Sequence, residues 1–182
     1  MSGTSLDGVD IIYSTIFQKD DRFYFEILAS ETVPYSKEWD AKLRGAFNDS
    51  PEKIKKLSKE YGVFLGKLVN VFIQNNTLNE VDFVASHGHT IFHKPNQGIT
   101  LQIGDGQAIS NELGLKVVCD FRAQDVALGG QGAPLVPIGD KLLFGDYTYC
   151  LNLGGFANIS YEHFGERIAF DICPVNIVLN HY

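Results

Sequence analysis

The sequence predicts an α/β domain with a central mixed sheet flanked by helices. Strand-like segments come as an adjacent pair at the start of the chain and are later interleaved with helical segments, which favours a mixed sheet over a purely parallel one. Polar clusters directly follow several predicted strands, and open α/β sheets bind ligands at the carboxyl ends of their strands. The chain has 182 residues, 45% of them hydrophobic, and no repeat or linker, so we expect one domain with its own core.

Two strands and then two helices are predicted in the first half of the chain: Asp10–Phe17, Phe23–Val33, Ser36–Phe47 and a longer helix from Ser50 to about Asn75. The strands are rich in Ile, Tyr, Phe and Thr, which sheets favour, and the polar turn Gln18–Arg22 joins them. Ser50, Pro51 and Glu52 form a helix start, because they supply a cap, a proline for the first turn and an early acid. Apolar residues then recur at helical spacing.

Shorter elements are predicted in the second half: strands at Val81–Ser86, Ile99–Ile103, Leu115–Cys119, Tyr147–Leu153, Asn158–Tyr161 and Ile168–Asp171, and helices at Gly106–Leu113 and from Pro174 onward. The segment Asp125–Pro137 is rich in glycine and proline and is predicted to be a loop. The strand that should lead into the first turn would precede Met1, and the last helix is short. We therefore expect a segment of something longer, truncated at both ends, whose exposed edges favour self-association.

The composition excludes several classes of function. The net charge is −7, which argues against a nucleic-acid surface or a surface for anionic membranes, although it does not exclude a nucleotide. No apolar run approaches the roughly 20 residues that span a bilayer, and no signal peptide is visible. Cys119, Cys150 and Cys173 are far apart in apolar segments, so we expect buried, reduced thiols, a cytoplasmic protein and no zinc site.

The first ten residues combine small hydroxyl side chains, glycines and carboxylates directly before a predicted strand. The hydroxyls are those of Thr4 and Ser5, the glycines are Gly3 and Gly8, and the carboxylates are Asp7 and Asp10. Glycine lets the backbone approach closely, and amides and hydroxyls donate hydrogen bonds to phosphate oxygens. The turn has neither the lysine of a P-loop nor the glycine spacing of a dinucleotide-binding turn. We interpret it as a phosphate-binding turn, with an ordinary β-turn as the alternative.

A second candidate is Asp171, which is predicted to end a strand just before a helix. A carboxylate at that position can act as a general base on a hydroxyl or a water. The alternative is a structural role as a helix cap.

Three histidines, His87, His89 and His93, lie within seven residues. The first two would share a face of an extended strand, so metal binding is conceivable. Few acidic residues are near, and the segment Ser86–Thr90 contains a glycine, so a flexible loop that contacts substrate is the better interpretation. For His93, a solvent-exposed position is an equally good explanation.

Two further loops carry polar residues. Arg122 lies between Asp120 and Asp125 and precedes the glycine-rich segment Gly129–Pro134; it could bind a carboxylate or phosphate, or pair internally with an aspartate. Asp105 could coordinate hydrated Mg²⁺ or cap the helix that follows it. The segment Leu153–Asn158 again places two glycines and a polar side chain after a strand.

Six motifs together carry a resemblance to a known family. They are Met1–Asp10, Ser86–Thr90, Asp120–Arg122, Gly129–Pro137, Asn152–Ile159 and Ala169–Asp171. In this order, over essentially the whole chain, they resemble the N-terminal portion of the anhydro-N-acetylmuramic acid kinases of bacterial cell-wall (peptidoglycan) recycling.

The resemblance implies a sugar kinase of the superfamily that includes acetate and sugar kinases, Hsp70 and actin. Such proteins have two ribonuclease-H-like lobes that close on ATP and Mg²⁺, and residues 1–182 would be the N-terminal lobe. The family opens the 1,6-anhydro bond of its amino sugar with water and phosphorylates O6. The aspartate that matches Asp171 would activate the water, as in glycoside hydrolysis.

The resemblance also implies roles for the other candidates. ATP and its phosphates would be bound by Ser2, Gly3, Thr4, Ser5, Asp7, Gly154 and Gly155, with Asp7 at the metal. The sugar would be bound by His87, Gly88, His89, Thr90, Arg122, Gly130, Gln131, Gly132 and Asn152.

The chain departs from the family pattern at some positions. Ile172 and Cys173 stand where threonine and glycine are usual, and His89 stands where glutamine is usual. The resemblance implies a C-terminal lobe beyond residues 1–182, so we expect this chain alone to be inactive. A related kinase for another sugar, a non-catalytic sugar-binding or regulatory lobe, and a homodimer all stay open.

Overall fold

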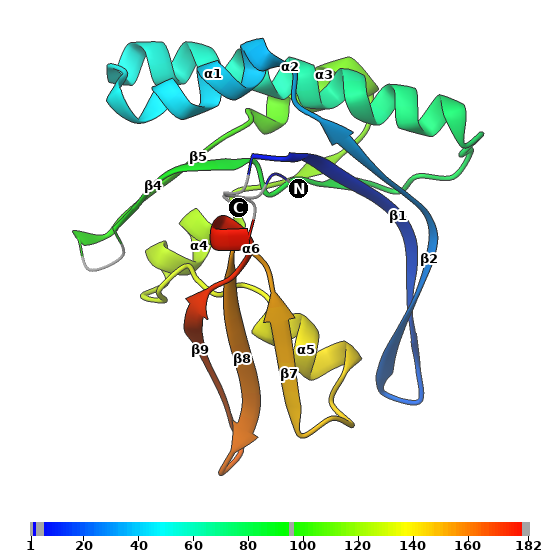
Figure 1. Cartoon of the computed structure of the whole chain (residues 1–182). Coiled ribbons are helices and arrows are strands. Elements are labelled where there is room, and N and C mark those ends of the chain that lie inside the picture. Colours follow the sequence, from blue (N-terminus) through cyan, green and yellow to red (C-terminus); the bar gives the residue numbers. More distant parts are fainter. Residues whose placement is uncertain (1, 3–5, 95–96, 180–182) are drawn as a thin grey trace. The chain divides into compact units, whose positions relative to one another are not determined.

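The structure is a computed structural model that describes residues 2, 6–94 and 97–179. Within these residues the chain forms nine strands and six α-helices, which confirms the mixed α/β class (Figure 1). The chain divides into two compact units. Unit 1 comprises Met1–Ile11 and Ser30–Gly132, and unit 2 comprises Ile12–Ala29 and Ala133–Tyr182. The sequence contains no linker that predicts these boundaries.

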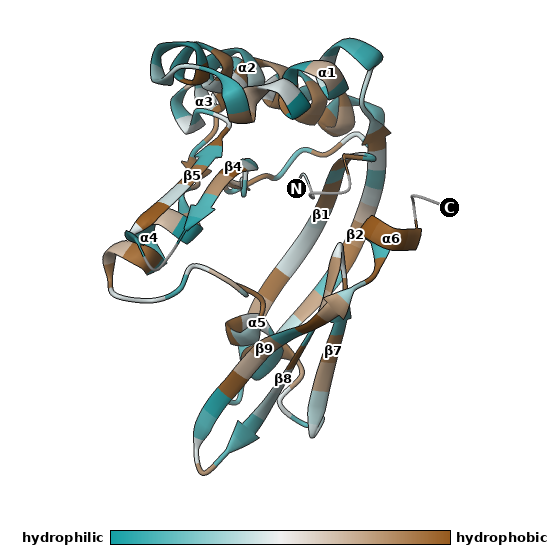
Figure 2. Cartoon of the chain, turned by 60° about the vertical axis from the view of Figure 1, so that its left-hand side comes forward, coloured by the Kyte–Doolittle hydropathy of each residue, from teal (hydrophilic) through white to brown (hydrophobic). Residues whose placement is uncertain are grey.

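The helices α1 (Lys37–Gly45) and α2 (Pro51–Asn75) of unit 1 begin where the sequence predicts. Ser36 caps α1 by accepting a hydrogen bond from the Trp39 amide, and Ser50 caps α2 in the same way. A short 3-10 turn, Ala46–Asn48, separates the two helices. Brown and teal alternate along α1 and α2 in Figure 2, as expected for helices with one apolar face.

Helix α2 provides most of the core of unit 1. Its buried apolar residues are Ile54, Leu57, Tyr61, Leu65 and Phe72. Gly62 and Gly66, one turn apart, allow α3 (Gly106–Leu113) to approach closely. A Cβ on Gly62 would lie 2.6 Å from the carbonyl oxygen of Asp105, and a Cβ on Gly66 would lie 2.6 Å from the Cβ of Glu112. The two helices pack directly, as Figure 1 shows.

Unit 1 contains two small sheets. Strands β3 (Val84–Ala85) and β6 (Val117–Val118) pair in parallel, and both are shorter than predicted. Strand β5 (Ile99–Ile103) has its predicted bounds and pairs antiparallel with β4 (His89–Lys94).

Strand β4 was not predicted, because we expected a flexible loop around its first residues. Gly88, at φ +70°, directs the chain into this strand, and a Cβ there would overlap the carbonyl oxygen of Ile103. His89 and Thr90 therefore belong to a strand rather than a loop, because the pairing with β5 fixes them.

Two helices replace parts of the predicted glycine-rich loop. Helix α4 (Phe121–Ala127) includes Arg122 and Asp125, and helix α5 (Pro137–Leu143) begins at a proline in unit 2. Pro137 fits the first turn of a helix, where no amide partner is needed. The loop prediction was therefore wrong at both ends of the segment.

Strands β1 (Gly8–Lys19) and β2 (Arg22–Pro34) form the predicted hairpin. Its two turn residues, Asp20 and Asp21, both have positive φ, of 49° and 60°, which suits a tight hairpin turn. The tip belongs to unit 2, where Arg22 forms an ion pair of 3.2 Å with Asp146.

Unit 2 is built on an antiparallel sheet of β7 (Tyr149–Leu153), β8 (Phe156–His163) and β9 (Glu166–Pro174), followed by α6 (Asn176–Leu179). Strand β9 continues to Pro174, which pairs with Phe156. The prediction that Asp171 ends a strand was therefore wrong: Asp171 lies inside β9, because β8 offers partners beyond it.

The expected single central sheet is replaced, among the described residues, by four separate sheets, of which β3–β6 is parallel. Sequence patterns identify strands, but they do not identify which strands share hydrogen bonds.

The expected burial of the cysteines also differs. Cys119 and Cys150 are half-buried, whereas Cys173 is exposed, because it lies on β9 near the end of the three-stranded sheet. Across the described ranges, no helix combines the length and the apolar character that crossing a membrane requires.

Candidate functional site

A buried polar network surrounds Ser2 in unit 1. Ser2 is 6% exposed, and its backbone forms an antiparallel bridge with Val9, which closes the loop that carries Asp7. The Ser2 Oγ lies 2.9 Å from His89 Nδ1 on β4 and accepts a hydrogen bond of 2.6 Å from the Tyr35 hydroxyl. The Tyr35 and Tyr61 hydroxyl oxygens are 2.5 Å apart.

Counting protons fixes part of this network: the single Tyr35 proton is donated to Ser2, so Tyr35 accepts from Tyr61. Between Ser2 and His89 the direction depends on the histidine tautomer. Ser2 donates to Nδ1 where the ring carries its proton on Nε2, and this arrangement requires a neutral His89. Burial, assisted by the nearby His87, lowers the pKa of His89 to about 4, which agrees with a neutral ring.

A second cluster in unit 1 is centred on Arg122. Its guanidinium donates a hydrogen bond of 2.6 Å to the Gly132 carbonyl and lies 3.2 Å from His87 Nε2. Because arginine only donates, His87 accepts through Nε2. Burial lowers the pKa of Arg122, and burial with the neighbouring arginine lowers that of His87. The structure thus brings together three residues to which the resemblance assigns a role at the sugar.

The internal Arg–Asp pair considered for Arg122 is not formed among the residues that the structure describes. Asp125 instead accepts a hydrogen bond of 2.6 Å from the Gly132 amide. A Cβ on Gly132, at φ +71°, would lie 2.8 Å from the Arg122 Cγ, and a Cβ on Gly130 would overlap the Asp125 carboxylate. The glycine-rich loop is therefore folded tightly against α4, while Gln131 is exposed.

Unit 2 places three polar side chains in one row of the three-stranded sheet. Asn152 of β7 pairs with Asn158 of β8, which pairs with Asp171 of β9. Directly opposed residues of antiparallel strands project from the same face, so the two amides and the carboxylate share one face. Asp171 is exposed, and no described side chain is hydrogen-bonded to its carboxylate. Asn158 belongs to the motif Asn152–Ile159 but was not among the predicted site residues, because only the strand register shows that it lies beside Asp171.

The strand β9 contains a bulge next to Asp171. Asn158 pairs with Asp171 and Ala157 with Cys173, so Ile172 is the extra residue. Ile172 and Cys173 are the two residues that depart from the family pattern. The departure therefore falls at an irregularity of the backbone beside the candidate base.

Gly154 and Gly155 form the turn between β7 and β8 and hold the start of α6. The Gly155 carbonyl accepts a hydrogen bond of 2.8 Å from the Val175 amide, and the Gly154 carbonyl accepts one of 3.2 Å from the Asn176 amide. The Gly154 amide itself donates to the Phe156 carbonyl at 3.3 Å. This amide is thus used within the turn.

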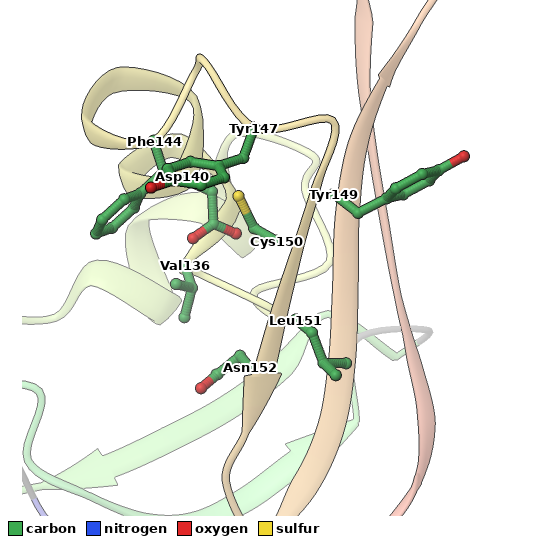
Figure 3. A pocket seen from close by; sticks show the side chains of 8 residues that line it. All are labelled: Val136, Asp140, Phe144, Tyr147, Tyr149, Cys150, Leu151 and Asn152. Atoms are coloured by element: carbon green, nitrogen blue, oxygen red, sulfur yellow. The ribbon is translucent and has the colours of Figure 1, made fainter.

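A pocket of about 400 Å³ lies beside β7 in unit 2. Figure 3 shows Cys150 and Asn152 on the same side of β7 as Asp140, whereas Tyr149 and Leu151 point to the opposite side. The pocket therefore opens on the face that also carries Asn158 and Asp171.

The remaining predicted residues are placed as follows. Gly3, Thr4 and Ser5 lie outside the described residues, and Asp7 is exposed. Asp105 caps α3 by accepting a hydrogen bond of 2.7 Å from the Ala108 amide, which was one of its two proposed roles. Within the described ranges, no three His, Cys, Asp or Glu side chains are grouped so that they could hold a metal ion. The closeness of Asp171 to the Ser2–Ser5 turn stays a prediction.

These features define an α/β protein whose polar side chains gather next to glycine turns, as in proteins that bind polar ligands. A sequence model of the anhydro-N-acetylmuramic acid kinases matches residues 1–182, and the chain belongs to this family.

Curated relatives agree with this assignment. Anhydro-N-acetylmuramic acid kinases from Rhizobium etli and Paramagnetospirillum magneticum are 34% and 36% identical over 200 and 188 residues, and one from Brucella canis is 33% identical over 201. Each match includes 100% of this chain but 53%, 52% and 53% of the relative. The chain spans about half the length of these relatives.

Proposed function

We propose that the protein is an ATP-dependent kinase that opens 1,6-anhydro-N-acetylmuramic acid with water and phosphorylates O6, giving N-acetylmuramic acid 6-phosphate for peptidoglycan recycling. The names of the relatives support the substrate and the reaction class. The observation in this chain that carries the proposal is the exposed Asp171 in a row with two asparagines on one sheet face.

In this proposal Asp171 acts as the general base. It removes a proton from water as the water oxygen attacks the anomeric carbon, C1, and the bond between C1 and O6 breaks. The electron pair of that bond stays on O6, which attacks the γ-phosphorus of ATP and displaces ADP. Asn158 and Asn152 have amide donors and acceptors that suit sugar hydroxyls or the attacking water.

The residues of unit 1 would bind the substrates. The half-buried His87 and Arg122 would contact the sugar, and the buried Gly132 would hold Arg122 in place through its carbonyl. Gly88, Thr90, Gly130 and Gln131, which are close to them in sequence, are the further candidates for the sugar. The turn Ser2–Ser5 would bind the phosphates through backbone amides, with Gly154 and Gly155 as further candidates.

Where the structure describes the chain, no three ligating side chains are grouped, so the donor set suits an Mg²⁺ ion that is bound together with ATP. Magnesium that accompanies ATP keeps several waters and is bound by one or two carboxylates together with phosphate oxygens. The exposed Asp7 fits this role as a single carboxylate. When bound, the ion would neutralise charge on the phosphoryl group that is transferred.

We further propose a ribonuclease-H-like, actin-like fold in which residues 1–182 form an N-terminal lobe and a second lobe supplies most of the adenosine pocket. We propose a cytoplasmic localisation, which the free cysteines support. A homodimer stays a prediction that these residues do not test.

The experiment uses the full-length protein with ATP, Mg²⁺ and the anhydro sugar in ¹⁸O-water. The proposal expects the label at C1 of the product and unlabelled oxygen in the phosphate. Asp171→Asn is expected to lower kcat by about 10²- to 10⁴-fold with little change in the Kd for the sugar. Glu166→Gln, an exposed carboxylate on the same strand, is the matched control and should leave kcat unchanged.

The same experiment tests the alternative of a non-catalytic binding lobe, which the replacement of threonine and glycine by Ile172 and Cys173 favours. A binding lobe would bind the sugar but form no ATP-dependent product. Normal turnover by Asp171→Asn, or a label in the phosphate, would contradict the proposed mechanism.

A further inference from the structure

We propose that Tyr35 and His89 are positioning residues that hold the Ser2 hydroxyl, so that Ser2 fixes the base of the phosphate-binding turn instead of donating its proton to ATP. This inference rests on the proposed function, and it assigns roles to two residues outside the turn. His89 then acts through Ser2 rather than on the sugar.

Three of the four side chains of the network are withdrawn from water, and the fourth, Tyr35, is half-buried. Ser2 is 6% exposed, His89 is 5% exposed and Tyr61 is fully buried. A hydroxyl in such surroundings loses its hydrogen bonds to water and needs protein partners. Each of these side chains has such a partner within the network.

The proposal includes the tautomer of His89 that carries its proton on Nε2. In this tautomer Nδ1, 2.9 Å from the Ser2 Oγ, accepts the one Ser2 proton, while the Ser2 oxygen accepts from Tyr35. A donation from Ser2 to a phosphate oxygen would break the bond to His89 and leave a buried acceptor unsatisfied. The side chain of Ser2 is therefore committed to the protein.

The two ends of the network are anchored in the fold of unit 1. Tyr61 belongs to α2, and its ring contacts Trp39 and Phe64 at centroid distances of 5.5 and 5.9 Å. His89 is fixed by pairing with Ile103 in β5. Both anchors therefore lie on regular elements.

Ser2 in the middle is joined to Val9 by a backbone bridge, which closes the loop carrying Asp7. The charges of Asp7 and Asp10 contribute to raising the pKa of Tyr35, although burial is the larger cause, so these carboxylates lie near the network. Moving Ser2 would consequently move the end of the loop that carries the candidate metal ligand.

The test is a double-mutant cycle in the full-length protein. Tyr35→Phe removes the hydroxyl that Ser2 accepts from, and Ser2→Ala removes the hydroxyl itself. We expect Tyr35→Phe to lower kcat/KM for ATP about tenfold in the wild-type background and less than about twofold in the Ser2→Ala background. The KM for the sugar should stay unchanged in both, which a general loss of structure would not produce.

Position 89 supplies an independent measurement. His89→Gln retains an acceptor for the Ser2 proton and should keep kcat/KM for ATP within about threefold, whereas His89→Leu should lose about tenfold. Tyr24→Phe, on the β1–β2 hairpin, is the control for removal of a tyrosine hydroxyl and should leave both constants unchanged.

The outcomes separate this inference from the proposed function. Wild-type protein without ATP-dependent product would overturn the function. The function stands if the wild type is active and Asp171→Asn is inactive. In that case the positioning role is overturned if Tyr35→Phe has equal effects in both backgrounds, or if it raises only the KM for the sugar. If Tyr35→Phe does not fold, the pair His89→Gln and His89→Leu decides, and equal activities of these two contradict the proposal.

Discussion

Substitution of Gly132 by alanine tests the packing of the glycine-rich loop against Arg122. Gly132 has φ +71°, and a Cβ there would lie 2.8 Å from both the Arg122 Cγ and the Val126 Cγ2. The left-handed backbone costs a residue with a Cβ about 1–2 kcal/mol. The two close contacts add about 1–3 kcal/mol of overpacking. We therefore expect Gly132→Ala to lower the free energy of unfolding by about 2–5 kcal/mol.

Gly114→Ala is the matched control for this prediction. Gly114 has φ +68°, nearly the same backbone, but nothing lies within 4 Å of its hypothetical Cβ. It should show the backbone cost alone, about 1–2 kcal/mol. The difference between the two variants therefore reports the combined contacts with Arg122 and Val126.

Urea unfolding and sugar kinetics of the full-length protein measure both effects. Displacement of Arg122 should weaken its hydrogen bonds to Gly132 and His87 and raise the sugar KM about tenfold in Gly132→Ala. Gly114→Ala should keep the wild-type KM. Equal destabilisation of the two variants, with no change in KM, would refute both the packing argument and the assignment of this cluster to the sugar.

Three further predictions concern stability. The Ser160 hydroxyl donates a hydrogen bond of 2.5 Å to Asp140 and accepts one of 2.8 Å from Arg167. Ser160→Ala removes both bonds and should lower the free energy of unfolding in urea by about 2–4 kcal/mol, and a decrease below about 0.5 kcal/mol would contradict this. Asp105→Ala should lower the free energy of unfolding by about 1 kcal/mol, because it removes the cap of α3, whereas Asp105→Asn should keep the cap and the stability. Equal decreases in the two variants would show that the charge of Asp105, and not its hydrogen bond, stabilises the helix. His89 has a pKa of about 4 when folded and 6.5 as its ordinary value, so the unfolded chain takes up a proton first as the pH falls. The contribution of His89 to stability should therefore decrease by about 3 kcal/mol between pH 6.5 and pH 4. His89→Gln should show a slope that is smaller by this contribution, because burial also lowers the pKa of His87, which remains in the variant.

Local signals in the sequence predicted the elements that local interactions determine. Ser50 with Pro51 starts α2, Asp105 caps α3, and Gly114, with its positive φ, ends that helix where predicted. These are contacts within a few residues, so the sequence alone is sufficient. The helix α4 was missed because its short sequence lies beside glycines that suggested a loop.

The site was predicted less completely than the elements. The motifs identified Asp171, Arg122 and His87 as polar residues near strand ends. They did not identify the partners of these residues, since the bond from Arg122 to His87 spans 35 positions and that between Ser2 and His89 spans 87. The predicted strand end at Asp171 lies three residues before the observed end of β9 at Pro174, because the pairing of β9 depends on the length of β8.

The sequence by itself determined the mixed α/β class, the main helices, the hairpin and the residue types able to bind phosphate and sugar. The tertiary structure decided which of those residues meet. It committed Ser2 to a buried network, placed Arg122 against Gly132, and aligned Asn152 and Asn158 with Asp171. The physical reason is that capping and periodicity act over single turns of the chain, whereas burial and strand register depend on segments that are distant in sequence and become neighbours through folding.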